Sequence, residues 1–216
     1  MAEFTALPSF IKVCGVTSIE DARCVEVAGA SAIGLILAAS PRRIPFDLAR
    51  DICGATRGSI LRVGVFRDND AAFVCDAVDA TGVDIAQVHG ELGVELAGEL
   101  RRRNVGIIKA LSVGTQEFFE FDERVADAIL VDGPRPGSGL THTWDDLLQR
   151  DFERPVIAAG GLSPSNVAQV LEITGAWGVD VATGVEMAPG VKDASLVRDF
   201  VANAKIHFKQ REEECD

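Results

Sequence analysis

The chain has 216 residues, of which 47% are hydrophobic and 25% are charged, a balance typical of a folded globular protein rather than a disordered or collagen-like chain. Its 21 Lys and Arg residues against 33 Asp and Glu residues give a formal net charge of −12. This charge argues against nucleic acid or an anionic membrane surface as the main partner. An anionic ligand must therefore be bound by local groups.

The cysteines and histidines favour a reducing, cytoplasmic compartment and no metal site. The cysteines are not arranged as CxxC pairs, so neither a disulfide framework nor a zinc ribbon is predicted. The histidines lie far apart and lack the spacing of a structural metal site. The first ten residues lack the features of a signal peptide, and no apolar run approaches the ~20 residues that span a bilayer.

Short apolar runs alternate with segments of helical periodicity along the whole chain. Eight predicted strands lie at Phe10–Val13, Ala32–Leu37, Ile60–Phe66, Asp84–Val88, Val105–Ala110, Ala128–Val131, Pro155–Ala159 and Trp177–Val181. Predicted helices between and after them include Ser18–Ala28, Val94–Arg103, Ser165–Ile173 and Ala194–Ala204. Strands that are apolar throughout and separated by amphipathic helices indicate a parallel sheet covered by helices.

Eight such units predict an α/β protein with a (β/α)8 TIM barrel fold. The alternative is an open doubly wound sheet, which usually has a GxGxxG loop after its first strand. Here the first strand is followed by Cys14-Gly15-Val16-Thr17. No linker divides the chain, so a single barrel domain is predicted over residues 1–216, with a frayed, charged tail from Lys205 to Asp216.

Two glycine-containing loops predict a phosphate site. Gly160 and Gly161 follow the seventh predicted strand, and Thr183 and Gly184 follow the eighth. Small residues let backbone N–H groups approach an anion, and a helix that begins after strand eight would add its positive end. Barrels of this kind bind phosphate at these two loops. A single glycine pair would indicate only a tight turn, but two such loops after consecutive strands favour phosphate.

Further polar residues come at strand ends, where the chemistry of such barrels takes place. Asp132 would be costly to bury unless it is used or paired. Cys14 could be either reactive or a small buried hydrophobic residue, and His89 could be a structural hydrogen-bonding residue. Arg42 offers a planar fork for a carboxylate but could equally be solvated.

A lysine two residues before Cys14 is predicted to face the barrel interior one layer deeper than the cysteine. This residue, Lys12, could form an interior ion pair with Asp180, and that structural interpretation is the preferred one.

A series of motifs along nearly the whole chain matches the pattern of one known enzyme family. The matching segments are Ile11-Lys12-Val13-Cys14-Gly15-Val16-Thr17, Gly34-Leu35-Ile36-Leu37 with Ser40-Pro41-Arg42, Val63-Gly64-Val65-Phe66, Gln87-Val88-His89-Gly90, Leu130-Val131-Asp132-Gly133, Gly137-Ser138-Gly139, Ala159-Gly160-Gly161-Leu162, Gly178–Glu186 and Pro189–Asp193. They extend in order from about Ile11 to Phe200, and in this order they resemble the phosphoribosylanthranilate isomerase family of tryptophan biosynthesis.

This resemblance implies a barrel isomerase that needs no cofactor and converts N-(5-phosphoribosyl)anthranilate, a phosphorylated small molecule, to the corresponding 1-deoxyribulose 5-phosphate. A monomer or homodimer is expected. It implies that Cys14 is the general base, that Asp132 is the general acid and that Arg42 anchors the anthranilate carboxylate. The loops of Gly160-Gly161 and Thr183-Gly184 would bind the phosphate. His89 and Asp180 are further candidate substrate-binding residues.

The chain departs from the family pattern at four places. It has Pro136 where a glycine is common, His142-Thr143 before Trp144 where Phe-Asp is common, Ala182 in place of a serine, and Arg43 at a position that is often aromatic.

The implied chemistry needs a protonated Asp132 and an ionised Cys14 in the same molecule. Desolvation and the nearby substrate phosphate are expected to raise the pKa of Asp132. Lys12 or the positive end of a helix is expected to lower the pKa of Cys14.

Two other functions remain open from the sequence. One is the same type of isomerisation on another aminoaldose phosphate, such as the intermediate of histidine biosynthesis, where relatives generally use two aspartates. The other is a phosphate-binding barrel without catalytic activity, because the fold alone does not establish a reaction.

Overall fold

Eight parallel strands close into a barrel in the computed structural model of the chain, which describes residues 3–56, 60–133 and 144–215. The strands are β1 (Phe10–Cys14), β2 (Ala32–Ile36), β3 (Leu61–Arg67), β4 (Ile85–His89), β5 (Gly106–Ser112), β6 (Ala128–Asp132), β7 (Val156–Ala159) and β8 (Gly178–Val181). Each pairs with the next, and β1 pairs with β8, which closes the ring. The predicted (β/α)8 fold is confirmed.

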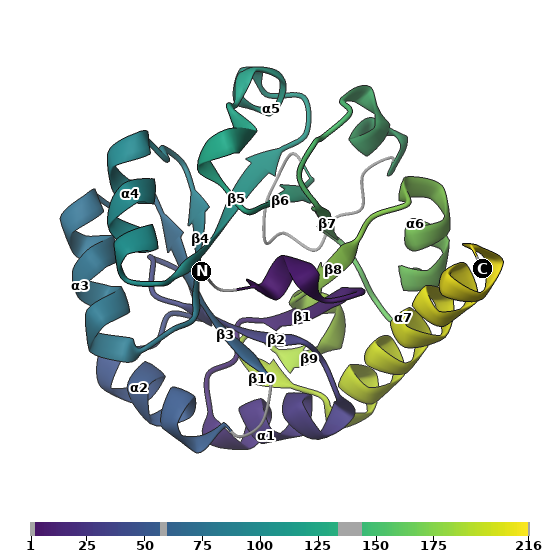
Figure 1. The fold of residues 1–216 in the computed structure, drawn as a ribbon. Helices are drawn as coiled ribbons and strands as arrows, with labels where there is room; N and C mark the ends of the chain where they lie inside the picture. Colours follow the sequence, from purple (N-terminus) through teal and green to yellow (C-terminus); the bar gives the residue numbers. More distant parts are fainter. Residues whose placement is uncertain (1–2, 57–59, 134–143, 216) are drawn as a thin grey trace.

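Helices surround the barrel on the outside (Figure 1). The α-helices are α1 (Ile19–Ala28), α2 (Phe46–Ala55), α3 (Ala71–Thr81), α4 (Val94–Arg102), α5 (Gln116–Glu120), α6 (Val167–Thr174) and α7 (Ala194–Cys215). The described residues also form the 3₁₀ helices η1 (Glu3–Ala6), η2 (Glu123–Val125), η3 (Trp144–Gln149) and η4 (Thr183–Val185), and a two-stranded sheet that joins β9 (Glu186–Ala188) to β10 (Val191–Lys192). The sixth unit differs from the prediction, because its described residues form η3 and not an α-helix.

Local signals account for where the first helix begins and ends. The Ser18 side chain caps α1 by accepting a hydrogen bond from the N–H of Asp21, and Gly29 ends the helix in the left-handed conformation with φ of 79°. The predicted helix Ser18–Ala28 is therefore confirmed to within its cap.

Helix α7 continues through the segment that the sequence predicts as a frayed tail. Ala204 and Phe208 are buried, and the Arg211 guanidinium donates a hydrogen bond to the carbonyl of Ala176 at 3.0 Å. These contacts hold the later turns against the body of the barrel. The helix thus runs to Cys215 through the segment for which the sequence predicts a frayed tail.

Residues of each strand alternate between the inside and the outside of the barrel. Phe10, Lys12 and Cys14 of β1 face the interior, whereas Ile11 and Val13 pack in the layer between the sheet and the helices. Both faces are buried, which explains why the strands read as continuous apolar runs. The same alternation decides which strand-end residues reach the cavity described below.

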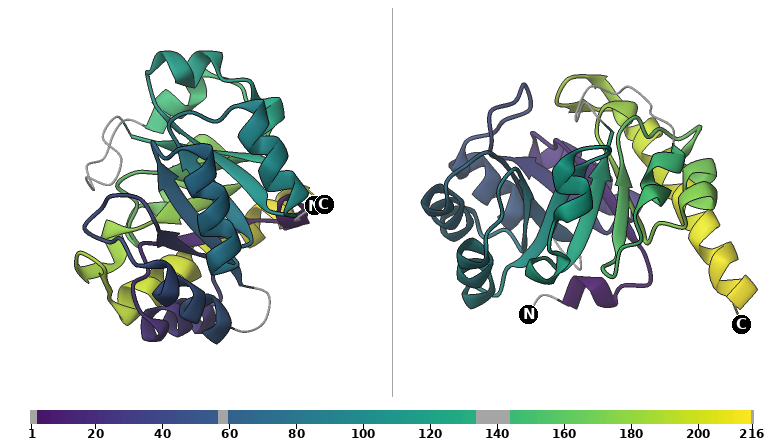
Figure 2. Two further views of the ribbon diagram at one scale, coloured as in Figure 1. Left: turned by 90° about the vertical axis from the view of Figure 1, so that its left-hand side faces the viewer. Right: turned by 90° about the horizontal axis from the view of Figure 1, so that it is seen from above.

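One end of the barrel is closed by aromatic side chains. Phe4 of η1 is 3% exposed, and its ring lies 5.8 Å from that of Phe10 and 6.2 Å from that of Trp177, measured between ring centroids. The Trp177 indole N–H donates to the carbonyl of Leu7 at 3.0 Å. Figure 2 (right) shows η1 at the end of the barrel opposite the C-terminal ends of the strands. A site for chemistry must therefore open at the other end.

No helix in the described ranges combines the length and the apolar character that crossing a membrane requires.

Candidate active site

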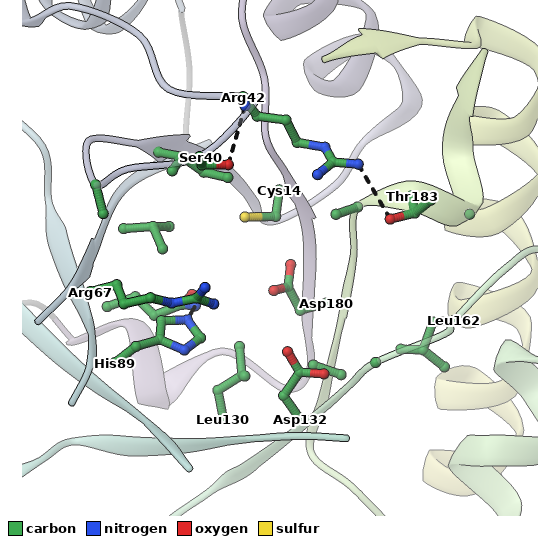
Figure 3. A pocket seen from close by; sticks show the side chains of 18 of the residues that line it. Cys14, Ser40, Arg42, Arg67, His89, Leu130, Asp132, Leu162, Asp180 and Thr183 are labelled. Atoms are coloured by element: carbon green, nitrogen blue, oxygen red, sulfur yellow. Dashed lines mark hydrogen bonds between the residues drawn. The ribbon is translucent and has the colours of Figure 1, made fainter. Parts of the chain in front are cut away.

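A cavity of about 400 Å³ opens at the C-terminal ends of the strands (Figure 3). All nine residues that the sequence analysis selects line it, namely Cys14, Arg42, His89, Asp132, Gly160, Gly161, Asp180, Thr183 and Gly184. They come from six of the eight strand ends, so only closure of the barrel brings them together.

Three of the polar side chains belong to the last residue of a strand, not to the loop after it. Cys14 ends β1, His89 ends β4 and Asp132 ends β6. Asp132 has the same parity as Leu130 in the barrel interior, so its carboxyl group points inward. Figure 3 shows Asp180 between Cys14 and Asp132, with all three directed into the cavity.

The Asp132 carboxyl group is buried, and its acidity is changed by that burial. The residue is 8% exposed, and desolvation raises its pKa from 3.8 to about 6, with a smaller contribution from the charge of Asp180. The N–H of Gly133 donates to Oδ1 at 2.8 Å and acts in the opposite direction without cancelling the effect. The predicted upward shift therefore exists before any substrate is bound.

The Cys14 thiol also has a raised pKa, because burial outweighs the charges of Lys12 and Lys192. Those two ammonium groups act to lower the pKa, as expected for Lys12, but the net direction is upward. The expectation of a lowered Cys14 pKa is thus wrong. At 6% exposure, the thiolate would lose more hydration free energy than it gains from the nearby lysine charges.

Lys12 and Asp180 form the interior ion pair that the sequence predicts. The Lys12 Nζ lies 2.8 Å from Asp180 Oδ2, and the Lys12 side chain is fully buried one layer below Cys14. Burial alone would lower the pKa of Lys12, but the carboxylate of Asp180 and the neighbouring Cys14 together raise it. The other carboxylate oxygen, Asp180 Oδ1, is buried without a hydrogen-bond partner among the described residues. Asp180 lines the cavity, so this oxygen is suited to accept a hydrogen bond from a ligand.

His89 is a neutral imidazole in this environment. Burial is the main cause that lowers its pKa to about 3, and the charges of Arg67, Lys12 and Lys109 add to it. Its Nε2 lies 2.9 Å from the Gln87 side-chain amide nitrogen. The side chain can therefore exchange hydrogen bonds with a ligand but supplies no positive charge.

The loop after β7 turns sharply and is held by hydrogen bonds from a side chain of the same loop. Gly160 and Gly161 have φ values of 91° and 69°, a region that favours glycine. The Asn166 side chain accepts a hydrogen bond from the N–H of Ser163 at 2.8 Å and donates one to the carbonyl of Gly161 at 2.9 Å. These two hydrogen bonds fix the backbone of the loop that is predicted to bind phosphate.

The loop after β8 approaches the loop after β7 more closely than a side chain would allow. A Cβ added at Gly184 would lie 1.9 Å from the carbonyl oxygen of Leu162. The predicted helix start after β8 is the single 3₁₀ turn η4, which is shorter than an ordinary helix. The two glycine loops thus form one continuous wall of the cavity.

Arg42 reaches the cavity from the loop after β2, but its guanidinium already has a partner. Its Nε lies 2.8 and 3.1 Å from the two carboxylate oxygens of Glu186, and its Nη2 lies 2.7 Å from Oε2. The Nη2 also lies 3.4 Å from the Thr183 hydroxyl (Figure 3). Glu186 is not among the site residues predicted from the sequence, because its side chain meets Arg42 only through the fold of the β9–β10 segment.

Arg67 and Gln87 also line the cavity and were not selected from the sequence. Arg67 ends β3 and Gln87 lies two residues before His89, so both have the inward parity. Strand parity applied to every polar residue near a strand end would have found both.

Some of the predicted features lie outside the described residues. These are the departures at Pro136 and His142-Thr143 and the Gly137-Ser138-Gly139 segment. Within the described ranges, no group of three or more His, Cys, Asp or Glu side chains is arranged to hold a metal ion.

Comparison with known proteins gives the family. The model of the N-(5′-phosphoribosyl)anthranilate (PRA) isomerase family matches residues 11–203. The N-(5′-phosphoribosyl)anthranilate isomerase of Rubrobacter xylanophilus is 39% identical over 202 residues, which cover 90% of this chain and 98% of the relative. The crystal structure of phosphoribosyl anthranilate isomerase from Thermus thermophilus is 38% identical with a TM-score of 0.80, covering 91% of this chain and 98% of that one. A phosphoribosyl anthranilate isomerase solved in complex with reduced 1-(o-carboxyphenylamino)-1-deoxyribulose 5-phosphate is 31% identical with a TM-score of 0.78, at 91% and 98% coverage. The chain therefore belongs to the PRA isomerase family.

Proposed function

We propose that this chain converts N-(5′-phosphoribosyl)anthranilate into 1-(o-carboxyphenylamino)-1-deoxyribulose 5-phosphate, a step of tryptophan biosynthesis. The observation that carries the proposal is that the Cys14 thiol and the Asp132 carboxyl group face one cavity. An Amadori rearrangement needs an acid and a base that act on different atoms of one bound sugar. The reduced product held by a relative is a molecule of this class.

In the proposed mechanism, the proton of Asp132 passes to the ring oxygen of the ribose as the bond between that oxygen and C1 breaks. The resulting iminium draws electron density from C2, and the Cys14 thiolate takes the C2 proton to leave an enolamine. This enolamine tautomerises to the ketone product. One proton is given and one is taken, so the enzyme returns to its starting state after proton exchange with water.

Burial increases the population of the reactive form of Asp132 and decreases that of Cys14. With a pKa of about 6, roughly a tenth of Asp132 is protonated at pH 7, against roughly 0.1% for an ordinary aspartate. The raised pKa of Cys14 makes the thiolate scarcer but also makes it a stronger base once formed. Burial thus supplies the acid, and the basic strength of the thiolate offsets part of its low population.

The remaining groups are proposed to bind the two ends of the substrate. The loops of Gly160-Gly161 and Thr183-Gly184 would hold the phosphate through backbone N–H groups. Arg42, whose Nη2 lies 3.4 Å from the Thr183 hydroxyl, would hold the anthranilate carboxylate. Asp180 and His89 would bind the sugar between them, with the unpartnered Asp180 Oδ1 accepting a hydrogen bond from a hydroxyl group.

The proposal retains the expected monomer or homodimer and the expected cytoplasmic location. Both stay predictions from the sequence.

The test is turnover of freshly formed phosphoribosylanthranilate, followed as loss of anthranilate fluorescence, by the unmodified chain and by Asp132→Asn and Cys14→Ala. We expect each substitution to lower kcat by roughly 10²- to 10⁴-fold, the usual contribution of a positioned acid or base. Cys75→Ala is the matched control, because Cys75 is also a buried cysteine but lies on α3 outside the cavity.

Two outcomes would contradict the assignment. A Cys14→Ala variant with an unchanged rate would refute the base, and an inactive unmodified chain would refute the reaction. Turnover of the aminoaldose phosphate of histidine biosynthesis in place of this substrate would favour the alternative isomerase.

A further inference from the structure

The guanidinium of Arg42 is held on one of its two hydrogen-bonding edges by a buried carboxylate. Glu186 contacts the edge formed by Nε and Nη2 in three hydrogen bonds of 2.7 to 3.1 Å. A guanidinium has a second edge, formed by Nη1 and Nη2, that can also take a carboxylate. Glu186 therefore fixes the plane of the group without using that second edge.

Glu186 is itself fixed by a second cation. The Lys192 Nζ donates to Glu186 Oε1 at 2.8 Å and to the carbonyl of Cys14 at 2.6 Å, and lies 3.4 Å from the carbonyl of Ala182. The N–H of Gly190 also donates to Oε1, at 3.2 Å. The ammonium thus ties Glu186 to the end of β1, where the proposed base lies, and to the end of β8.

These charges are removed from water, which shows that the arrangement is more than a surface contact. The side chains of Arg42, Glu186 and Lys192 are 11%, 3% and 0% exposed. Buried ion pairs of this kind are commonly no more stabilising than apolar side chains of the same volume. Stability therefore does not account for the network, whereas fixing the geometry of a functional group does.

The chain also leaves room for Arg42 in this position. A Cβ added at Gly15 would lie 2.6 Å from Cδ of Arg42, so the arginine stem packs directly over a glycine whose φ is 75°. Arg42 lies in the loop between β2 and α2, where its N–H donates to the Ser40 hydroxyl at 3.1 Å. An arginine on a loop without such contacts would lose much of its rotamer freedom on binding a ligand.

We propose that Glu186, held by Lys192, is a positioning residue that fixes the Arg42 guanidinium so that its second edge receives the carboxylate of the substrate. This inference rests on the proposed function. The contact of Nη2 with the Thr183 hydroxyl extends the same network to the phosphate loop. The network therefore sets the distance between the two anion sites and the placement of both relative to Cys14.

The first test is a double-mutant cycle of Glu186→Gln, Arg42→Met and the double variant, with KM and kcat measured for phosphoribosylanthranilate. We expect Glu186→Gln to raise KM about tenfold through the lost order of Arg42, with a smaller effect on kcat. In the Arg42→Met background the same substitution is expected to change KM less than twofold, because its target is gone.

The carboxylate dependence is tested with an analogue in which aniline replaces anthranilate. Its KM is expected to be the same for the unmodified chain and for Glu186→Gln. The matched control is Glu123→Gln, because Glu123 makes a 2.7 Å ion pair with Arg150 away from the cavity. This control is expected to leave both KM values unchanged.

A measurement on the unmodified chain keeps the inference testable if Glu186→Gln does not fold. The ¹⁵N order parameter of the Arg42 Nε–H group is expected to match that of rigid backbone, about 0.85, whereas exposed Arg50 is expected below about 0.6. Equal mobility of Arg42 and Arg50, or additive KM effects in the cycle, would overturn the role of Glu186. Absence of turnover by the unmodified chain would instead refute the proposed function.

Discussion

The same physical cause raises the pKa of Asp132 and of Cys14, but it favours the reactive form of Asp132 and disfavours the reactive form of Cys14. Desolvation disfavours the charged form of each side chain. For Asp132 the favoured neutral form is the one that donates a proton. For Cys14 the favoured neutral form is the one that must first lose a proton. The productive pair is therefore a minority state whose population depends on both groups.

This pairing predicts a characteristic pH dependence of kcat/KM. Below about pH 6 Asp132 is already protonated, so the rate should rise about tenfold per pH unit as the thiolate forms. Above about pH 6 the gain in thiolate cancels the loss of protonated Asp132, and the rate should level off until Cys14 ionises. The measurement is the profile of kcat/KM from pH 4 to 9.

The control for this profile is Asp132→Asn, because the substrate phosphate also ionises near pH 6. The break near pH 6 should disappear in the residual activity of this variant. A break that persists unchanged would belong to the phosphate and would contradict the assignment of the acid.

The raised pKa of Asp132 also predicts that this residue lowers the stability of the fold at neutral pH. Its folded pKa of about 6 exceeds the unfolded value, so the free energy of unfolding should fall as pH rises from about 4 to about 6. We expect Asp132→Asn to raise the free energy of unfolding at pH 7 by about 1 to 3 kcal/mol, with a smaller gain at pH 4. Thermal unfolding at both pH values tests this, and a destabilised variant at pH 7 would contradict it.

At the scale of the elements, the cavity depends on backbone that leaves no room for side chains. Gly184 packs against the carbonyl of Leu162, and the Asn166 side chain braces the turn before it. Two loops that are adjacent only in the folded barrel therefore have interdependent shapes. The phosphate site is a property of both loops together and of neither alone.

A methyl group at Gly184 is therefore expected to separate the two loops. Gly184→Ala places Cβ 1.9 Å from a backbone carbonyl oxygen, which must move because it is not the flexible end of a side chain. We expect KM to rise at least tenfold and the protein to lose about 1 to 3 kcal/mol of stability, the usual range for overpacking. Steady-state kinetics and urea unfolding measure the two effects.

Gly54→Ala is the control for this substitution, because a Cβ at Gly54 of α2 meets nothing within 4 Å. It should leave KM unchanged and should not destabilise the protein. A Gly184→Ala variant that behaves like this control would show that the close approach of the loops is not required.

At the scale of the whole molecule, the two ends of the barrel have different tasks. The end near η1 is filled by Phe4, Phe10 and Trp177, whereas the opposite end carries the cavity and its polar groups. This division is general for such barrels: residues at the N-terminal ends of the strands contribute to stability, whereas residues at the C-terminal ends carry the function. It predicts that stability and activity can be changed separately.

Phe4→Ala tests this separation. Removing a ring that is 3% exposed is expected to lower the free energy of unfolding by about 3 to 5 kcal/mol, with kcat and KM unchanged at 25 °C. Thermal unfolding and steady-state kinetics at a temperature where the variant is folded give the two results. A changed KM in the folded variant would show that the closed end influences the cavity.

The sequence by itself determined the barrel, because strands buried on both faces must be apolar throughout and eight of them recur in order. It also determined nine of the residues that line the cavity, since strand ends of a parallel barrel meet at one face. Strand parity was enough to direct Lys12 into the barrel interior, where the register of β1 with β8 brings it to Asp180.

Only the tertiary structure decided the protonation of the cavity and the partners of its charges. The pKa of Cys14 depends on how much water burial removes, which its sequence neighbours do not reveal. Glu186 meets Arg42 across 144 residues, and Lys192 meets the carbonyl of Cys14 across 178. Such contacts depend on where the β9–β10 segment lies after β8, and no local periodicity encodes that position.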